Sequence, residues 1–239
     1  MKKTLTLIVF FVFIYCNVFA QLNLTFTRRG TYKPTKIEYG FLSGVNFNTI
    51  RQNNVNTFLN ETVTNYAGIS VGGYFKVNIN QLFGIRILVQ YDQNGYRLGD
   101  LTFTDANGIN LAPGNVTIKT NYLNFPIVGE FTFGNKIKYY VNAGPYVGLL
   151  LRSNVITRIY SMDGSLPSLT KDKSDAYKST NFGVSFSSGT LIPISKKMQL
   201  HIAVKNNLGL SNIVKPISSD NSLFKTNAFS MLAGINVGL

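Results

Sequence analysis

Polar and apolar side chains alternate along about eight segments between residues 38 and 239. A period of two is the pattern of a β-strand whose two faces meet different surroundings. The connections between the segments are alternately long and short. The long ones are predicted at residues 49–65, 99–115, 160–177 and 213–225, and the short ones centre on Asn80-Gln81, Gly134-Asn135 and Ser195-Lys196. Long loops at one end and short turns at the other are typical of a membrane β-barrel with an even number of strands.

The final segment shows the alternation most clearly. One face carries Phe229, Met231, Ala233, Ile235, Val237 and Leu239, and the other is dominated by Ser230, Gly234, Asn236 and Gly238. A soluble lipocalin-like barrel would alternate in the same way, with its apolar face inside. The polar faces of this chain are rich in glycine, serine and asparagine, which suits the narrow interior of eight strands, whereas a soluble exterior would carry many charges. The predicted fold class is therefore all-β, an eight-stranded antiparallel up-and-down transmembrane β-barrel with short periplasmic turns and long extracellular loops.

The composition favours the same membrane interpretation. Charged residues make up 14% of the chain, against about a quarter of a typical soluble protein. Beyond residue 20 the sequence contains no run of eighteen apolar residues, so a spanning helix is not expected. A closed barrel is then the way for every backbone group to find a partner in lipid.

The first twenty residues are predicted to be a signal peptide. Lys2-Lys3 begins it, Leu5 to Tyr15 forms its apolar run, and Val18-Phe19-Ala20 supplies a small-x-small cleavage signal. Residues 21–37 are interpreted as an N-terminal leader and residues 38–239 as the barrel domain. Cleavage would remove Cys16, the single cysteine, so no disulfide, zinc cluster or thiol nucleophile is expected in the mature chain. The expected location is the bacterial outer membrane.

The positive charge of the chain is dispersed along the sequence. The formal net charge is +13 at pH 7, yet the basic residues form no single dense patch. Nucleic-acid binding requires cations gathered on one face, and it also conflicts with export from the cytoplasm. Attraction to anionic lipid headgroups is the milder inference, so outer-membrane lipid is the expected partner.

Three stretches resemble the small outer-membrane β-barrel proteins of the PorT type. They are YGFLSGVNF at residues 39–47, NYLNFPIVGEFTF at 121–133 and YYVNAGPYVGLLL at 139–151. The resemblance covers most of the mature chain and rests on a glycine-rich first strand, a Y-L-x-x-P strand and an x-A-G-P-Y-x-G strand. It implies the barrel fold. One member type of that family is implicated in a protein secretion apparatus, and nothing in this sequence singles out that role.

Four charged residues are predicted to face the lumen near the periplasmic rim. Lys76, Arg86 and Glu130 each lie about three or four residues from a short turn, and Glu38 opens the first strand nearby. At about 3.4 Å per residue, they would form one layer roughly 10 to 14 Å along the strands. The layer is interpreted as a salt-bridge plug that fills a narrow interior, with a proton or ion relay as the functional alternative.

His201 is the only histidine, and its parity with Lys205 places it in the lumen. A lone histidine of this kind is interpreted as a hydrogen-bonded filler. An outer-membrane lipid hydrolase would need a serine nucleophile and an acidic partner within reach of the histidine, and no serine lies nearby on the lipid face. One histidine without cysteine does not furnish the usual zinc site, so no metal or other cofactor is expected.

The sequence therefore predicts an integral envelope protein of structural or loop-mediated binding role, without catalysis and without an open pore. The polar loops would present a surface to envelope or secretion proteins, because binding often resides in loops on a rigid scaffold. A secretion component, a surface adhesin and an outer-membrane lipid hydrolase remain as alternatives.

Overall fold

The computed structural model describes the backbone of residues 37–53, 63–104, 110–161, 164–165, 168–215 and 223–238. The predicted signal peptide and all of the predicted leader except Ile37 lie outside these described residues. Ile37 already belongs to the first strand. Among the described residues, no helix has the length and apolar character needed to span a membrane.

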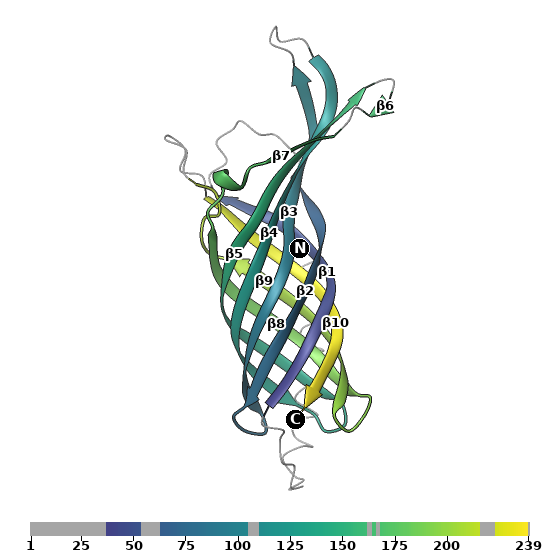
Figure 1. The fold of residues 1–239 in the computed structure, drawn as a ribbon, viewed down its shortest axis with the longest axis vertical. Coiled ribbons are helices and arrows are strands. Elements are labelled where there is room, and N and C mark those ends of the chain that lie inside the picture. Colours follow the sequence, from purple (N-terminus) through teal and green to yellow (C-terminus); the bar gives the residue numbers. More distant parts are fainter. Residues whose placement is uncertain are drawn as a thin grey trace, which may run out of the picture.

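Eight long strands form a closed antiparallel ring (Figure 1). They are β1 (Ile37–Asn53), β2 (Val63–Asn78), β3 (Phe83–Thr104), β4 (Asn110–Phe133), β5 (Lys138–Ser161), β8 (Thr180–Pro193), β9 (Met198–Gly209) and β10 (Leu223–Gly238). Each strand pairs with the next long strand along the chain, and β1 pairs with β10 from Glu38↔Gly238 to Asn53↔Leu223. Within the closed ring this pairing leaves no free strand edge, as a lipid environment requires.

The three predicted short turns are confirmed at residues 79–82, 134–137 and 194–197. Gly134 has a φ of 100°, a left-handed conformation that suits glycine in a tight turn. The side chain of Asn80 accepts hydrogen bonds from the backbone N–H groups of Leu82 and Phe83, which stabilises the first of these turns. Strand β10 ends at the same end of the barrel (Figure 1).

The burial pattern shows which face meets lipid. Large apolar side chains on the outer face are half exposed, such as Phe41 at 55%, Ile127 at 53% and Met231 at 52%, whereas Arg86 and Glu130 are at most 1% exposed. A soluble protein would bury the first set and expose the second. The prediction of an apolar face toward lipid and a polar face toward the lumen is therefore confirmed.

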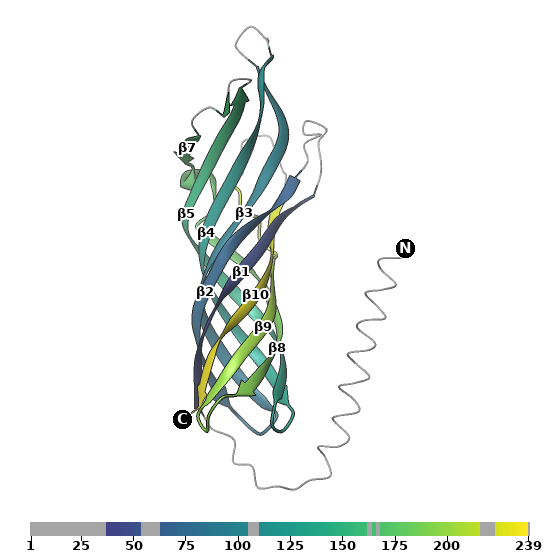
Figure 2. The ribbon, with the colours of Figure 1, turned by 90° about the vertical axis from the view of Figure 1, so that its right-hand side faces the viewer.

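The predicted loop at residues 99–115 is wrong. Strand β3 runs to Thr104 and β4 begins at Asn110, so most of that segment is a hairpin. Figure 2 shows β3, β4 and β5 rising beyond the rest of the barrel as a projecting sheet. The polar composition of this segment was compatible with paired strands, because a strand with both faces in water can carry polar residues and still pair with its neighbours.

The other three predicted loops are also partly strand, since β10 begins at Leu223, within the predicted loop at residues 213–225. Strand β1 extends to Asn53 and β2 begins at Val63. Within residues 160–177 lie the short strands β6 (Gly164–Ser165) and β7 (Leu169–Asp172) and the 3-10 helix η1 (Ser174–Ala176). Strand β7 pairs with β5 and widens the projecting sheet.

Candidate functional site

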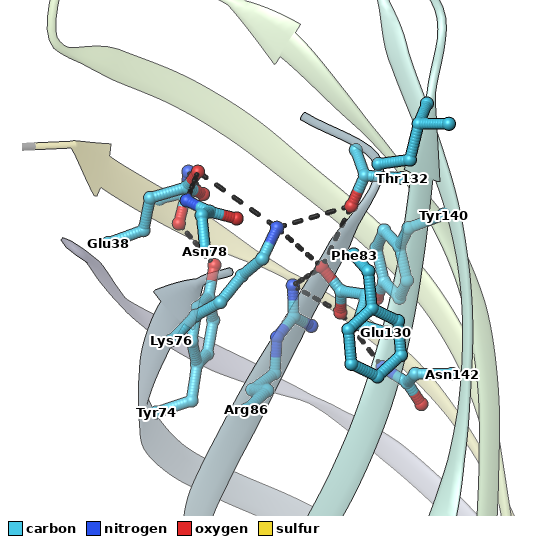
Figure 3. A network of polar contacts seen from close by, with 12 residues as sticks. Glu38, Tyr74, Lys76, Asn78, Phe83, Arg86, Glu130, Thr132, Tyr140 and Asn142 are labelled. Carbon is cyan, nitrogen blue, oxygen red and sulfur yellow. Dashed lines mark hydrogen bonds and ion pairs between the residues drawn. The ribbon is translucent and has the colours of Figure 1, made fainter. Parts of the chain in front are cut away.

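The four charges predicted to share a layer lie together inside the barrel (Figure 3). Sheet register aligns three of them, because Glu38 is opposite Lys76 and Lys76 is opposite Arg86. Glu130 accepts from both cations, at 2.9 Å from Lys76 Nζ and 2.8 Å from Arg86 Nη2. Lys76 Nζ also lies 4.0 Å from Glu38 Oε1. Glu130 is therefore the carboxylate that pairs with both cations, and Glu38 lies at the edge of the layer.

Neutral side chains complete the coordination of this charge layer. Asn142 donates to Glu130 at 3.0 Å, Asn78 and Asn236 donate to Glu38 at 2.8 and 3.0 Å, and Lys76 donates to Thr132 at 3.2 Å. The Arg86 guanidinium lies between two aromatic rings, 4.3 Å from the centroid of Tyr74 and 4.6 Å from that of Tyr140. Each buried charge of the layer therefore has hydrogen-bond or cation–π partners as well as ion pairs.

His201 lies next to the charge layer, fully buried, between the hydroxyl groups of two tyrosines. Its Nδ1 is 2.9 Å from the Tyr74 hydroxyl and its Nε2 is 2.7 Å from the Tyr140 hydroxyl. Tyr74 donates its single proton to Asn236 Oδ1 at 2.7 Å, so the Tyr74 oxygen must accept from Nδ1–H. Tyr140 contacts Nε2 on the other side of the ring. The orientation of the ring is thus set by its neighbours.

This orientation is transmitted from the carboxylate of the first strand. Asn236 donates its amide to Glu38 and to Gln199, at 3.0 and 2.8 Å, and this leaves Oδ1 to face Tyr74. Glu38 therefore orients the amide of Asn236, and Asn236 orients the hydroxyl of Tyr74. Tyr74 in turn orients the ring of His201. The sequence places His201 in the lumen but gives no sign of its tyrosine partners, which come from β2 and β5.

A second polar layer, absent from the sequence predictions, lies further from the short turns. Lys205 Nζ is 3.4 Å from Asp92 Oδ2 and also donates to Gln90. Asp92 accepts further hydrogen bonds from Ser70, Asn124 and Asn207. The alternation of polar and apolar residues does place Asp92 and Lys205 on the lumen-facing side of their own strands. It does not show that the two side chains contact each other across the lumen.

An apolar cluster lies at the loop end of the lumen. Ile118 of β4 packs with Tyr177 and Ile213, and all three side chains are buried. Tyr177 and Val214 form an isolated antiparallel bridge, and Lys178 N–H donates to the Ile213 carbonyl at 2.8 Å. These contacts link the segment that precedes β8 to the segment that follows β9. Across the part of the chain that the structure describes, no three histidine, cysteine or carboxylate side chains gather as a metal site would require.

A closed antiparallel ring with apolar residues outside and ion pairs inside defines the class of outer-membrane β-barrels. The chain belongs to the outer membrane protein beta-barrel domain family, whose model matches residues 19–215. Membership in this family indicates a location in the bacterial outer membrane.

Several solved barrels are similar to this chain at low identity. OprG from Pseudomonas aeruginosa is 11% identical, with 84% of this chain and 95% of OprG covered and a TM-score of 0.44. Neisserial surface protein A is 11% identical, with 85% and 97% covered and a TM-score of 0.43. The attachment invasion locus protein Ail of Yersinia pestis is 10% identical, with 83% and 97% covered and a TM-score of 0.38. No curated protein sequence matches the chain.

Proposed function

We propose that this outer-membrane barrel is a closed scaffold with a structural or loop-mediated binding role, without catalysis and without an open pore. The observation that carries the proposal is the filled interior. The charge layer around Glu130, the Asp92–Lys205 layer and the apolar cluster at the mouth follow one another along the lumen. An eight-stranded barrel has just enough interior room for side chains, and here they occupy it at three levels.

The ion pairs support a structural role rather than a relay. A relay needs ionisable groups that change partners, whereas Glu130 is bound at once by Lys76, Arg86 and Asn142. Breaking such a buried arrangement leaves uncompensated charge, so the layer favours one fixed state.

The surroundings of His201 support the absence of hydrolase activity. Both ring nitrogens contact tyrosine hydroxyls, and none of their described contacts is a serine. A general base that activates a nucleophile needs one nitrogen free to accept the proton of that nucleophile. The ring is also buried within the lumen, away from the lipid that would supply an acyl substrate.

Planar-bilayer recordings test the closed lumen. We expect the purified full-length barrel to give no steady ion current, because side chains block the path at three heights. An open porin inserted in the same bilayer is the positive control. A stable conductance that scales with the number of inserted barrels would contradict the closed scaffold.

A second candidate function is a PorT-like secretion component or a surface adhesin, delivered after cleavage at residue 20. The projecting sheet of β3, β4 and β5 favours it, since strands of 22, 24 and 24 residues exceed the 9 to 11 or so that cross a membrane. The excess length raises a rigid three-stranded surface above the bilayer. The stretches that resemble the PorT type lie on β1, β4 and β5.

Crosslinking tests this second candidate. We expect the intact chain to crosslink to a specific envelope or surface protein, and a variant with residues 99–115 replaced by Asn-Gly, which joins the register partners Leu98 and Val116, to lose that product. Asn-Gly closes tight hairpins, so the barrel below should be retained. Unchanged heat-modifiable migration in detergent gels is the control for folding. Identical crosslinked products from both proteins would contradict a role for the β3–β4 projection.

A further inference from the structure

Cationic residues lie on the outer face of the barrel toward its loop side. Among the residues of β3 and β4 whose side chains the structure describes, the last large apolar ones on the outer face are Tyr91 and Leu123, which are register partners. Lys119 lies four residues before Leu123 on β4, toward the loop side. On β1 and β10 the paired aromatic residues Phe47 and Phe229 are followed, again after four residues, by Arg51 and Lys225. On two separated parts of the wall, cations therefore follow a pair of large apolar residues after the same number of positions.

On the β3–β4 side, two cations lie close together on the outer face. Lys119 is opposite Gly95, and its Nζ lies 5.5 Å from the centroid of the Tyr66 ring. Arg97 is opposite Thr117, so it is a diagonal neighbour of Lys119, about 7 to 8 Å away at the backbone. Arg97 is exposed, and neither cation forms an ion pair with a described residue.

On the β1–β10 side, two cations face each other directly. Arg51 and Lys225 are register partners, an arrangement in which like charges repel. Arg51 donates to the Gly209 carbonyl at 2.9 Å, and within the described ranges no carboxylate pairs with either residue. A cross-strand pair of this kind is stabilised when an anion binds between its members.

Arg152 on β5 provides an internal comparison. Its Nε lies 3.1 Å from Asp172 Oδ2, and both side chains are exposed. Hydrogen bonds from Ser174, together with Arg152, hold the pKa of Asp172 below its usual range. Asp172 therefore stays ionised and neutralises Arg152, whereas none of the four cations above pairs with a carboxylate whose side chain the structure describes.

We propose that Arg51, Lys225, Arg97 and Lys119 form a cationic collar that binds the phosphate groups of phosphorylated lipids in the outer leaflet. Four residues of a strand tilted by about 40° rise roughly 10 Å, which carries the cations from the edge of the hydrocarbon into the headgroup region. Long cationic side chains reach toward phosphates at this level. The collar concerns the lipid-facing wall, so it goes beyond the proposed function and does not depend on what the loops bind.

Native mass spectrometry of the full-length barrel with bis-phosphorylated lipid A tests the collar. We expect Arg97→Gln with Lys119→Gln, and separately Arg51→Gln with Lys225→Gln, to weaken the apparent affinity about tenfold. Lys196→Gln with Lys197→Gln removes the same charge from a periplasmic turn and should leave the affinity unchanged. Arg152→Gln with Asp172→Asn removes an already neutral pair and should also have little effect.

Three outcomes would overturn the collar. One is an unchanged affinity in both collar variants when their heat-modifiable migration shows that they fold. Another is equal binding of fully dephosphorylated lipid A. The third is binding of soluble inositol hexakisphosphate without binding of lipid A, which would assign the cations to a soluble polyanion. None of these outcomes alters the expected conductance, so the closed lumen and the collar are tested separately.

Discussion

Replacing Glu130 with glutamine is expected to lower the free energy of unfolding by about 3–5 kcal/mol, because it leaves two buried cations with Glu38, 4.0 Å from Lys76, as their one counter-charge in the charge layer. Lys76 and Arg86 lie 2.9 and 2.8 Å from this carboxylate, and all three side chains are at most 2% exposed. The measurement is denaturant unfolding of the refolded barrel in detergent micelles, followed by heat-modifiable migration.

A matched pair of variants separates the buried charge from a general effect of mutation. Asp172→Asn removes the negative charge of the exposed Arg152 ion pair and should change stability little. Combining Glu38→Gln, Lys76→Met, Arg86→Met and Glu130→Leu should recover most of the loss, since replacing every charge of a buried ionic network with neutral residues leaves no ion uncompensated. A Glu130→Gln variant as stable as Asp172→Asn would show that the layer carries no such energetic weight.

Substituting alanine at Gly44 or Gly234 is expected to impair closure of the barrel. Both glycines lie on the seam between β1 and β10, where Gly44 is opposite Leu232 and Gly234 is opposite Leu42. A Cβ atom on Gly44 would clash with the Met231 carbonyl, and one on Gly234 would clash with the Phe41 carbonyl. Since backbone cannot yield as a side chain can, we expect each substitution to cost at least about 1–3 kcal/mol, with a larger loss for both together.

Refolding into detergent micelles measures this effect as the fraction of chain that shows heat-modifiable migration. Gly73→Ala is the control, because a Cβ there would meet the Gly40 carbonyl oxygen at 3.5 Å, an ordinary contact. This control should refold like the unmodified protein. Normal refolding of Gly234→Ala would mean that the seam is looser than its backbone spacing indicates.

The barrel and its charge layer were accessible from sequence because short turns fix register. Lys76 and Arg86 flank one four-residue turn, and in a tight hairpin the count from the turn sets which residues face each other. Glu130 is placed in the same way by the turn at residues 134–137. The number of residues between each charge and its nearest short turn was therefore enough to predict that Lys76, Arg86 and Glu130 lie in one layer.

Other contacts were not accessible, for a geometric reason. Asp92 and Lys205 lie on β3 and β9, which do not pair, so their meeting depends on the tilt and stagger of the whole ring. Alternation gives the face of a residue but not which heights coincide across the lumen. The projecting hairpin was missed because polar composition was interpreted as loop, although β3 and β4 remain paired up to Thr104↔Asn110.

The hydrogen bonds of Glu38 bear on how the chain assembles. This carboxylate, on the first strand, is satisfied in part by Asn236 on the last, 198 residues away in sequence, and Ser230 likewise reaches back to Asn46. A partly assembled hairpin stack that lacks β10 therefore holds an acidic group with too few donors in a place that water is leaving. When β10 pairs with β1, it closes the barrel and also supplies the missing hydrogen-bond donor to Glu38. Insertion should therefore proceed as a single cooperative event.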